Sequence, residues 1–123
     1  MTKFLLVVLG GAIGSSIRFL ISEKMITLNL GNFPYTIMLI NIVGSLIMGL
    51  TVGAFAKYNF SYEVKIFITA GILGGFTTFS AFSLDAVMLL EKGEYMNAAI
   101  YIFGSVFFSL LGFLTGYNLF RFV

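Results

Sequence analysis

Four long apolar runs, separated by short polar segments, organise the sequence. They cover residues 4–21, 35–56, 64–90 and 95–120. A helix needs about 20 mostly apolar residues to cross the hydrocarbon core of a bilayer. The pattern therefore predicts an all-α membrane protein with four transmembrane helices, forming a single domain over residues 1–123.

The third run differs from the others in length and composition. Its 27 residues (64–90) would form a straight helix about 40 Å long, which exceeds a hydrocarbon core of about 30 Å. Its middle holds Gly74-Gly75, a weak helical pair, and then Thr77-Thr78, whose hydroxyls can bond freed backbone groups. Irregular backbone at mid-membrane survives only when protein buries it or it lines a wet cavity. We therefore expect a helix break over residues 74–78, the kind of place where transport proteins hold ions.

Two polar side chains stand inside the first and second runs. Arg18 lies about one turn before the end of the first run, either as an anchor that reaches the interface or as part of a pore mouth. Asn41 is the one amide of the second run. An unpaired amide in hydrocarbon costs several kcal/mol, so Asn41 must face protein or water. A hydrogen bond between helices and a pore lining both satisfy that requirement.

The fourth run carries a polar stripe, and an aromatic pair follows the expected break. Tyr101, Ser105 and Ser109 recur every four residues, which places them on one helix face. The stripe fits either a track of hydroxyls for an ion or close packing between helices. Phe79 and Phe82 are three apart and share a face. Aromatic pairs in a span usually pack, but this pair directly follows the expected break, so a functional role stays open as well.

The composition narrows the function classes. The chain is 59% hydrophobic and 10% charged, whereas soluble domains carry about 25% charged residues. It contains no Cys and no His, so disulfides, thiolate metal sites and the commonest general base are absent. Buried hydroxyls without a base make a poor active site, and we do not expect an enzyme. A net charge of +2 gives no reason to expect nucleic acid, and the first run is interpreted as a retained span.

The positive charges are divided almost evenly between the two membrane faces. The two sets are Lys3, Lys57, Lys65 and Arg121 on one face, and Arg18, Lys24 and Lys92 on the other. The positive-inside rule needs a bias to fix an orientation. We therefore expect insertion in both orientations and a homodimer with an inverted copy, whose two-fold axis lies in the membrane plane. The break would lie near that axis, where freed carbonyls suit a desolvated cation such as Na⁺.

Three motifs carry a resemblance to a known family. They are GGAIGSSIRF at residues 10–19, NIVGS at 41–45 and GGFTTFSAFS at 74–83. They resemble the motifs G-G-x-x-G-A-x-x-R-[YF], N-x-x-G-S/A and G-G-x-T-T-F-S-T-F-S of the Fluc/CrcB family of fluoride channels, and the likeness covers essentially the whole chain. The sequence departs from the family's usual residues at Ser15, Thr36-Ile37, Ala81 and Asp85.

The resemblance implies an antiparallel, dual-topology homodimer with two fluoride pores in the plasma membrane. It implies export of fluoride that enters the cell as the neutral acid and ionises inside. The implied anion pathway contains Arg18, Asn41, Phe79, Ser80, Phe82, Tyr101, Ser105 and Ser109. The implied cofactor is a structural, non-transported Na⁺ at the dimer centre, held by the backbone carbonyls of Gly74 and Thr77, with no organic cofactor.

A small four-helix multidrug or metabolite exporter, which is also dual-topology, is the main alternative. Proton-coupled members of that class place a carboxylate at mid-membrane in the first helix. The first run here has none, and Asp85 lies near one end of the third run. A purely structural assembly partner would need no polar groups at mid-membrane. The sequence therefore favours the channel.

Overall fold

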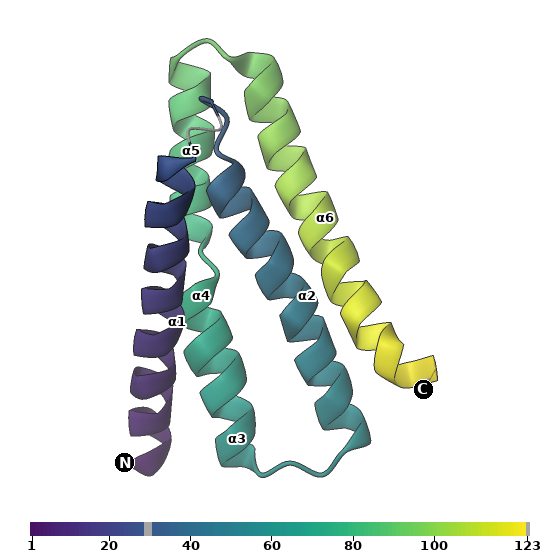
Figure 1. The fold of residues 1–123 in the computed structure, drawn as a ribbon. Coiled ribbons are helices and arrows are strands. Elements are labelled where there is room, and N and C mark those ends of the chain that lie inside the picture. The colour runs from purple at the N-terminus through teal and green to yellow at the C-terminus, as the bar shows by residue number, and fades with distance from the viewer. Residues whose placement is uncertain (29–30, 123) are drawn as a thin grey trace.

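The computed structural model describes residues 1–28 and 31–122, and they form a helical bundle (Figure 1). Its elements are α1 (Thr2–Thr27), α2 (Tyr35–Lys57), α3 (Tyr62–Ile66), the π-helical segment η1 (Phe67–Leu73), α4 (Gly74–Phe76), α5 (Phe79–Glu91) and α6 (Tyr95–Phe122). Within the described residues, four helical stretches are long and apolar enough to cross a membrane, and α3 to α5 together make the third. The prediction of four apolar helices is thereby confirmed.

The first helix is longer than the apolar run that predicted it. The run ends at Ile21, whereas α1 continues to Thr27. The added residues include no Gly and no Pro, so nothing in the backbone stops the helix there. The polar residues Glu23 and Lys24 end the apolar pattern without ending the helix.

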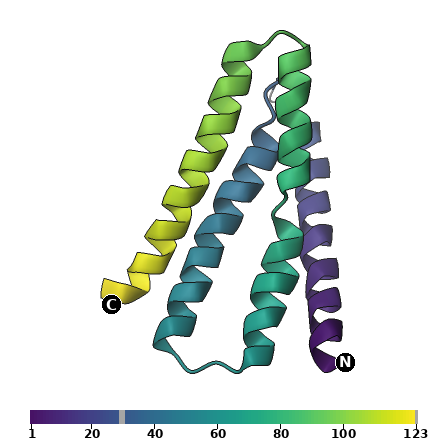
Figure 2. The same ribbon diagram turned by 180° about the vertical axis from the view of Figure 1, so that it is seen from behind.

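The helices associate as two pairs. Helix α1 lies beside the third span, α2 lies beside α6, and α2 stands between α6 and the third span (Figures 1 and 2). Glycines allow both pairs to approach closely: a Cβ on Gly75 would lie 2.6 Å from the carbonyl oxygen of Gly11, and one on Gly53 would lie 2.8 Å from that of Tyr117. The start of α1 and the end of α6 lie at the same end of the bundle.

The interruption of the third span falls on the threonines rather than on the glycine pair. Gly74 and Gly75 belong to α4, whereas Thr77 (φ −79°, ψ 158°) and Thr78 (φ −152°, ψ 126°) are extended between α4 and α5. Within the range 74–78 where a break was expected, the glycine pair is therefore helical and the threonines are extended. The close contact with Gly11 gives the physical reason, because Gly75 serves the packing of α1 against α4.

One cluster of buried apolar residues joins α5 to α6. It consists of Phe82, Ala86 and Leu89 of α5 together with Ala98 and Tyr101 of α6. Many large apolar side chains elsewhere point outward, as lipid-facing residues do. The core therefore fixes α5 against α6 directly beyond the interruption.

Candidate functional site

The two threonines of the interruption each complete a neighbouring helix. The backbone N–H and the hydroxyl of Thr77 both donate to the carbonyl of Leu73, each at 3.0 Å. The hydroxyl of Thr78 accepts from the backbone N–H of Ala81 at 3.2 Å, which makes Thr78 the N-cap of α5. The sequence Thr-Thr thus ends one helix and begins the next without an intervening loop.

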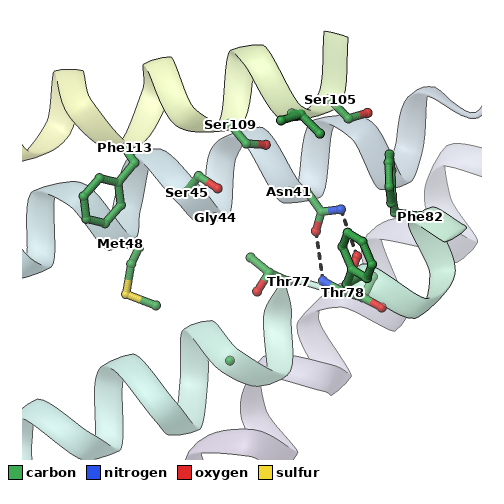
Figure 3. A pocket seen from close by; sticks show the side chains of 13 residues that line it. Asn41, Gly44, Ser45, Met48, Thr77, Thr78, Phe82, Ser105, Ser109 and Phe113 are labelled. Atoms are coloured by element: carbon green, nitrogen blue, oxygen red, sulfur yellow. Dashed lines mark hydrogen bonds between the residues drawn. The ribbon is translucent and has the colours of Figure 1, made fainter. Parts of the chain in front are cut away.

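The extended backbone of Thr78 is paired by a side chain from another helix. Asn41 of α2 donates from Nδ2 to the carbonyl of Thr78 and accepts at Oδ1 from its N–H, each at 2.9 Å (Figure 3). Unpaired backbone groups in an apolar medium cost several kcal/mol each, and one amide here satisfies two. Gly44, one turn further along α2, lets the methyl group of Thr77 come close because it has no Cβ of its own.

The same hydrogen bonds leave two carbonyls without their helical donors. In a continuous helix the N–H of Thr78 would donate to Gly74, but it donates to Asn41 instead. The N–H of Ala81 would likewise donate to Thr77, but it donates to the hydroxyl of Thr78. Neither of these N–H groups therefore donates to the carbonyl of Gly74 or Thr77, as it would in a continuous helix.

A pocket of about 460 Å³ adjoins the interruption and is open rather than enclosed (Figure 3). It brings together seven residues that the sequence singled out: Asn41, Gly74, Thr77, Phe79, Phe82, Ser105 and Ser109. They come from α2, from α4, from the interruption, from α5 and from α6. Within the described chain, no charged side chain lines this pocket.

Ser105 is the polar group of the pocket that most clearly needs a partner. Its side chain is 4% exposed, and its hydroxyl makes no hydrogen bond within the described structure. Ser109 lines the pocket one turn further along α6. Buried hydroxyls in native proteins are normally hydrogen-bonded, and the hydroxyl of Ser105 has a donor that no described residue uses.

Phe79 and Phe82 contribute to the pocket in different ways. Their ring centroids are 5.3 Å apart, at an interplanar angle of 38°. Phe82 is 8% exposed and belongs to the core, whereas Phe79 is 77% exposed. Phe82 is thus held in place by its neighbours, and Phe79 is free to face whatever adjoins the bundle.

Three residues of the predicted pathway do not line this pocket. Tyr101 lies behind Phe82, with its ring stacked at 5.3 Å and its hydroxyl donating to Oδ2 of Asp85 at 3.2 Å. Ser80 is exposed, with its hydroxyl 3.2 Å from that of Thr78. Arg18 is half-buried on α1. Their part in a pathway stays a prediction.

Several lining residues were not assigned to the pathway from the sequence, although Thr78 was expected to belong to the break; they are Gly44, Ser45, Met48, Thr78, Val106 and Phe113. Helical spacing was the signal that could have found most of them. Residues 44, 45 and 48 follow Asn41 at three, four and seven positions, and residue 113 follows Ser109 at four. Those residues share a face with the polar residues already chosen.

Fold and site together define a multi-pass helical membrane protein with an uncharged polar pocket beside a helix interruption. Residues 5–117 match the family model described as CrcB-like protein, Camphor Resistance (CrcB). The chain belongs to this family, which confirms the family membership that the motifs indicated.

Curated relatives match along nearly the whole chain. A protein named Fluoride-specific ion channel FluC from Rhodopseudomonas palustris (strain BisB5) is 46% identical over 119 residues, 96% of each chain. A protein of the same name from Agrobacterium fabrum is 45% identical over 98% of each chain. Another, from Parabacteroides distasonis, is 39% identical over 97% of this chain and 96% of the relative. These relatives are named as ion channels, a class distinct from enzymes.

The pairing of Asn41 with Thr78 generates a prediction about stability. Replacing Asn41 by Leu leaves the N–H and the carbonyl of Thr78 unpaired, at a cost of roughly 1–3 kcal/mol for each group. Asn118→Leu is the matched control, because the amide of Asn118 donates only to Leu114 of its own helix. Unfolding by denaturing detergent should show a large loss for Asn41→Leu and a small one for Asn118→Leu. Equal losses would mean that the pairing contributes nothing specific.

Proposed function

We propose that this chain is a fluoride-specific ion channel through which F⁻ leaves the cytoplasm. The observation that carries the proposal is a pocket of hydroxyl donors and aromatic rings, without a charged side chain among the described lining residues. The choice of fluoride as the ion comes from the name of the relatives, which match along nearly the whole chain. Neutral donors suit conduction, because a site that conducts must bind an ion weakly enough to release it.

Each polar group of the pocket has a role in this proposal. The hydroxyls of Ser105 and Ser109 replace water around the anion by donating to it. Asn41 has two amide hydrogens, and only one is needed for the carbonyl of Thr78. Phe79 and Phe82 offer the positive edges of their rings where no cationic side chain competes. Arg18, Ser80 and Tyr101 act outside the pocket, Tyr101 by supporting Phe82 from behind.

The functional assembly in this proposal is an antiparallel homodimer. Two observations support it. The pocket is open and Phe79 is 77% exposed, so a polar site would face lipid unless a second protein surface covered it. The count of Lys and Arg, four against three, gives little bias for one orientation.

A structural Na⁺ fits the interruption. The carbonyls of Gly74 and Thr77 have lost their helical donors, and such oxygens are the ligands a hard cation prefers. The ion would balance the partial negative charge of these carbonyls when bound. We place it at the dimer centre, where two interruptions would meet.

The function is tested by the release of fluoride from liposomes that contain only this protein, together with the variant Phe79→Ile. Because Phe79 is 77% exposed, its replacement removes the ring edge with little loss of packing inside the chain. Flux per folded protein should fall about tenfold or more, as expected from an interaction of about 1.4 kcal/mol. The control Phe107→Ile, 61% exposed on α6, should conduct normally.

Two results would contradict the assignment. A wild-type protein that releases no fluoride would remove the proposed function. Normal flux after Phe79→Ile would leave the function in place and take that ring out of the pathway, which would then have to follow Ser105 and Ser109.

If the chain inserts in both orientations, a thiol reagent added on one side of the membrane should reach about half of the molecules. The chain contains no Cys, so Asn59→Cys in the exposed loop between α2 and α3 introduces a unique thiol. An impermeant thiol reagent added outside sealed vesicles should label about half of the molecules, and all of them after permeabilisation. Labelling of all or none before permeabilisation would show one fixed orientation.

The Na⁺ site predicts a cation requirement. Replacing Na⁺ throughout by a bulky organic cation should lower fluoride flux or dimer stability, because such a cation cannot fit among carbonyl oxygens. The same measurement is repeated with Li⁺ and with K⁺ in place of Na⁺. A protein that behaves identically in all of these cations has no such site. Thr77→Ala is not a suitable probe, since the backbone carbonyl remains.

A further inference from the structure

Five aromatic rings form a continuous series from the start of α2, through Phe33 of the preceding loop, to the start of α5. Its members in order are Tyr35, Phe33, Tyr101, Phe82 and Phe79, with successive centroid separations of 4.5, 5.9, 5.3 and 5.3 Å. The other aromatic contacts of the described chain are separate pairs, such as Phe55–Phe60 and Phe107–Phe108. The series therefore links a residue outside the helices to the rings that line the pocket.

Tyr101 is the fixed member of this series. It is fully buried, and its hydroxyl donates to Asp85. Phe82 stacks on its ring at an interplanar angle of 26°, and Phe33 meets it edge-on at 80°. Phe33 also packs against the core of α5 and α6 from outside it. The plane of Tyr101 is thus held by contacts from α5 and from the loop.

The plane of Phe82 follows from the plane of Tyr101, because the two rings are stacked. That plane matters in the pocket, since an anion is attracted by the edge of an aromatic ring and repelled by its face. A modest rotation of the Phe82 ring would therefore exchange an attractive surface for a repulsive one. The contact between Phe33 and Tyr101 opposes such a rotation from a distance.

We propose that Phe33 is a positioning residue of the ion pathway, which orients the ring of Phe82 through Tyr101. Phe33 does not line the pocket and need not touch the ion. The inference rests on the proposed function. It adds a determinant of permeation outside the transmembrane helices, in the loop that precedes α2.

The experiment compares Phe33→Leu with Phe33→Tyr in the liposome assay. Leu keeps much of the apolar volume but has no ring edge, whereas Tyr keeps the ring. Phe60→Leu is the matched control, because Phe60 is also a loop phenylalanine in edge contact with a helix ring, that of Phe55 at 5.1 Å and 60°. Flux per folded protein should fall about fivefold for Phe33→Leu, matching an aromatic pair worth about 1 kcal/mol. Phe33→Tyr and Phe60→Leu should stay near wild type.

The elution profile and melting temperature of each variant are measured on the same preparation. If Phe33→Leu does not elute as a single species, Phe33→Met replaces it, because a flexible thioether fills irregular gaps. Normal fluoride flux in the Leu or Met variant overturns the proposal. It is also overturned if Phe33→Tyr loses flux as Phe33→Leu does, or if Phe60→Leu shows the same loss. A wild-type protein that conducts no fluoride would contradict both the proposed function and this inference. Normal flux in both the wild type and Phe33→Leu would contradict this inference alone.

Discussion

The two hydrogen bonds between Asn41 and Thr78 are the interaction on which the rest of the structure depends. A helix inside a membrane cannot stop unless the groups it abandons find other partners. The side-chain amide of Asn41 presents a donor and an acceptor in the arrangement of a backbone peptide, so it satisfies both groups of one extended residue. Once Thr78 is extended, α5 can begin afresh and the pocket has its polar wall.

The chain divides support and chemistry between different surfaces. The glycines of α1 and α4 bring two backbones together without side chains between them. The opposite side of the interruption faces α2 and α6, where hydroxyls and rings gather around open space. The close contact between α1 and α4 on one side of the interruption thus supports the uncharged pocket on the other side.

The sequence predicted the spans well, because long apolar runs have few other interpretations. It also singled out residues 74–78, since polar groups at mid-membrane need a reason. It could not choose between Gly74-Gly75 and Thr77-Thr78. A glycine pair fits a kink and a close helix contact equally well, and only the position of Gly11 on another helix separates them. The end of α1 was misjudged for a related reason, because polarity marks where lipid ends and not where a helix ends.

The site was partly predictable for similar reasons. Asn41 had two open roles, and the structure shows that it bonds the extended backbone of Thr78 in another span while it lines the pocket. The stripe of Tyr101, Ser105 and Ser109 was correct as a face of α6, but its members meet different surroundings. Tyr101 reaches the core formed with α5, and the serines reach the pocket. Such differences arise from contacts between helices, which the periodicity of a single helix does not contain.

The placement of both chain ends at one end of the bundle has a consequence for genetic duplication. Two copies joined by a short connector would enter the membrane facing the same way, because an even number of crossings returns the chain to its starting side. A fused protein whose two halves have opposite orientations in the membrane would need an odd number of additional transmembrane segments between them. Separate chains meet no such restriction.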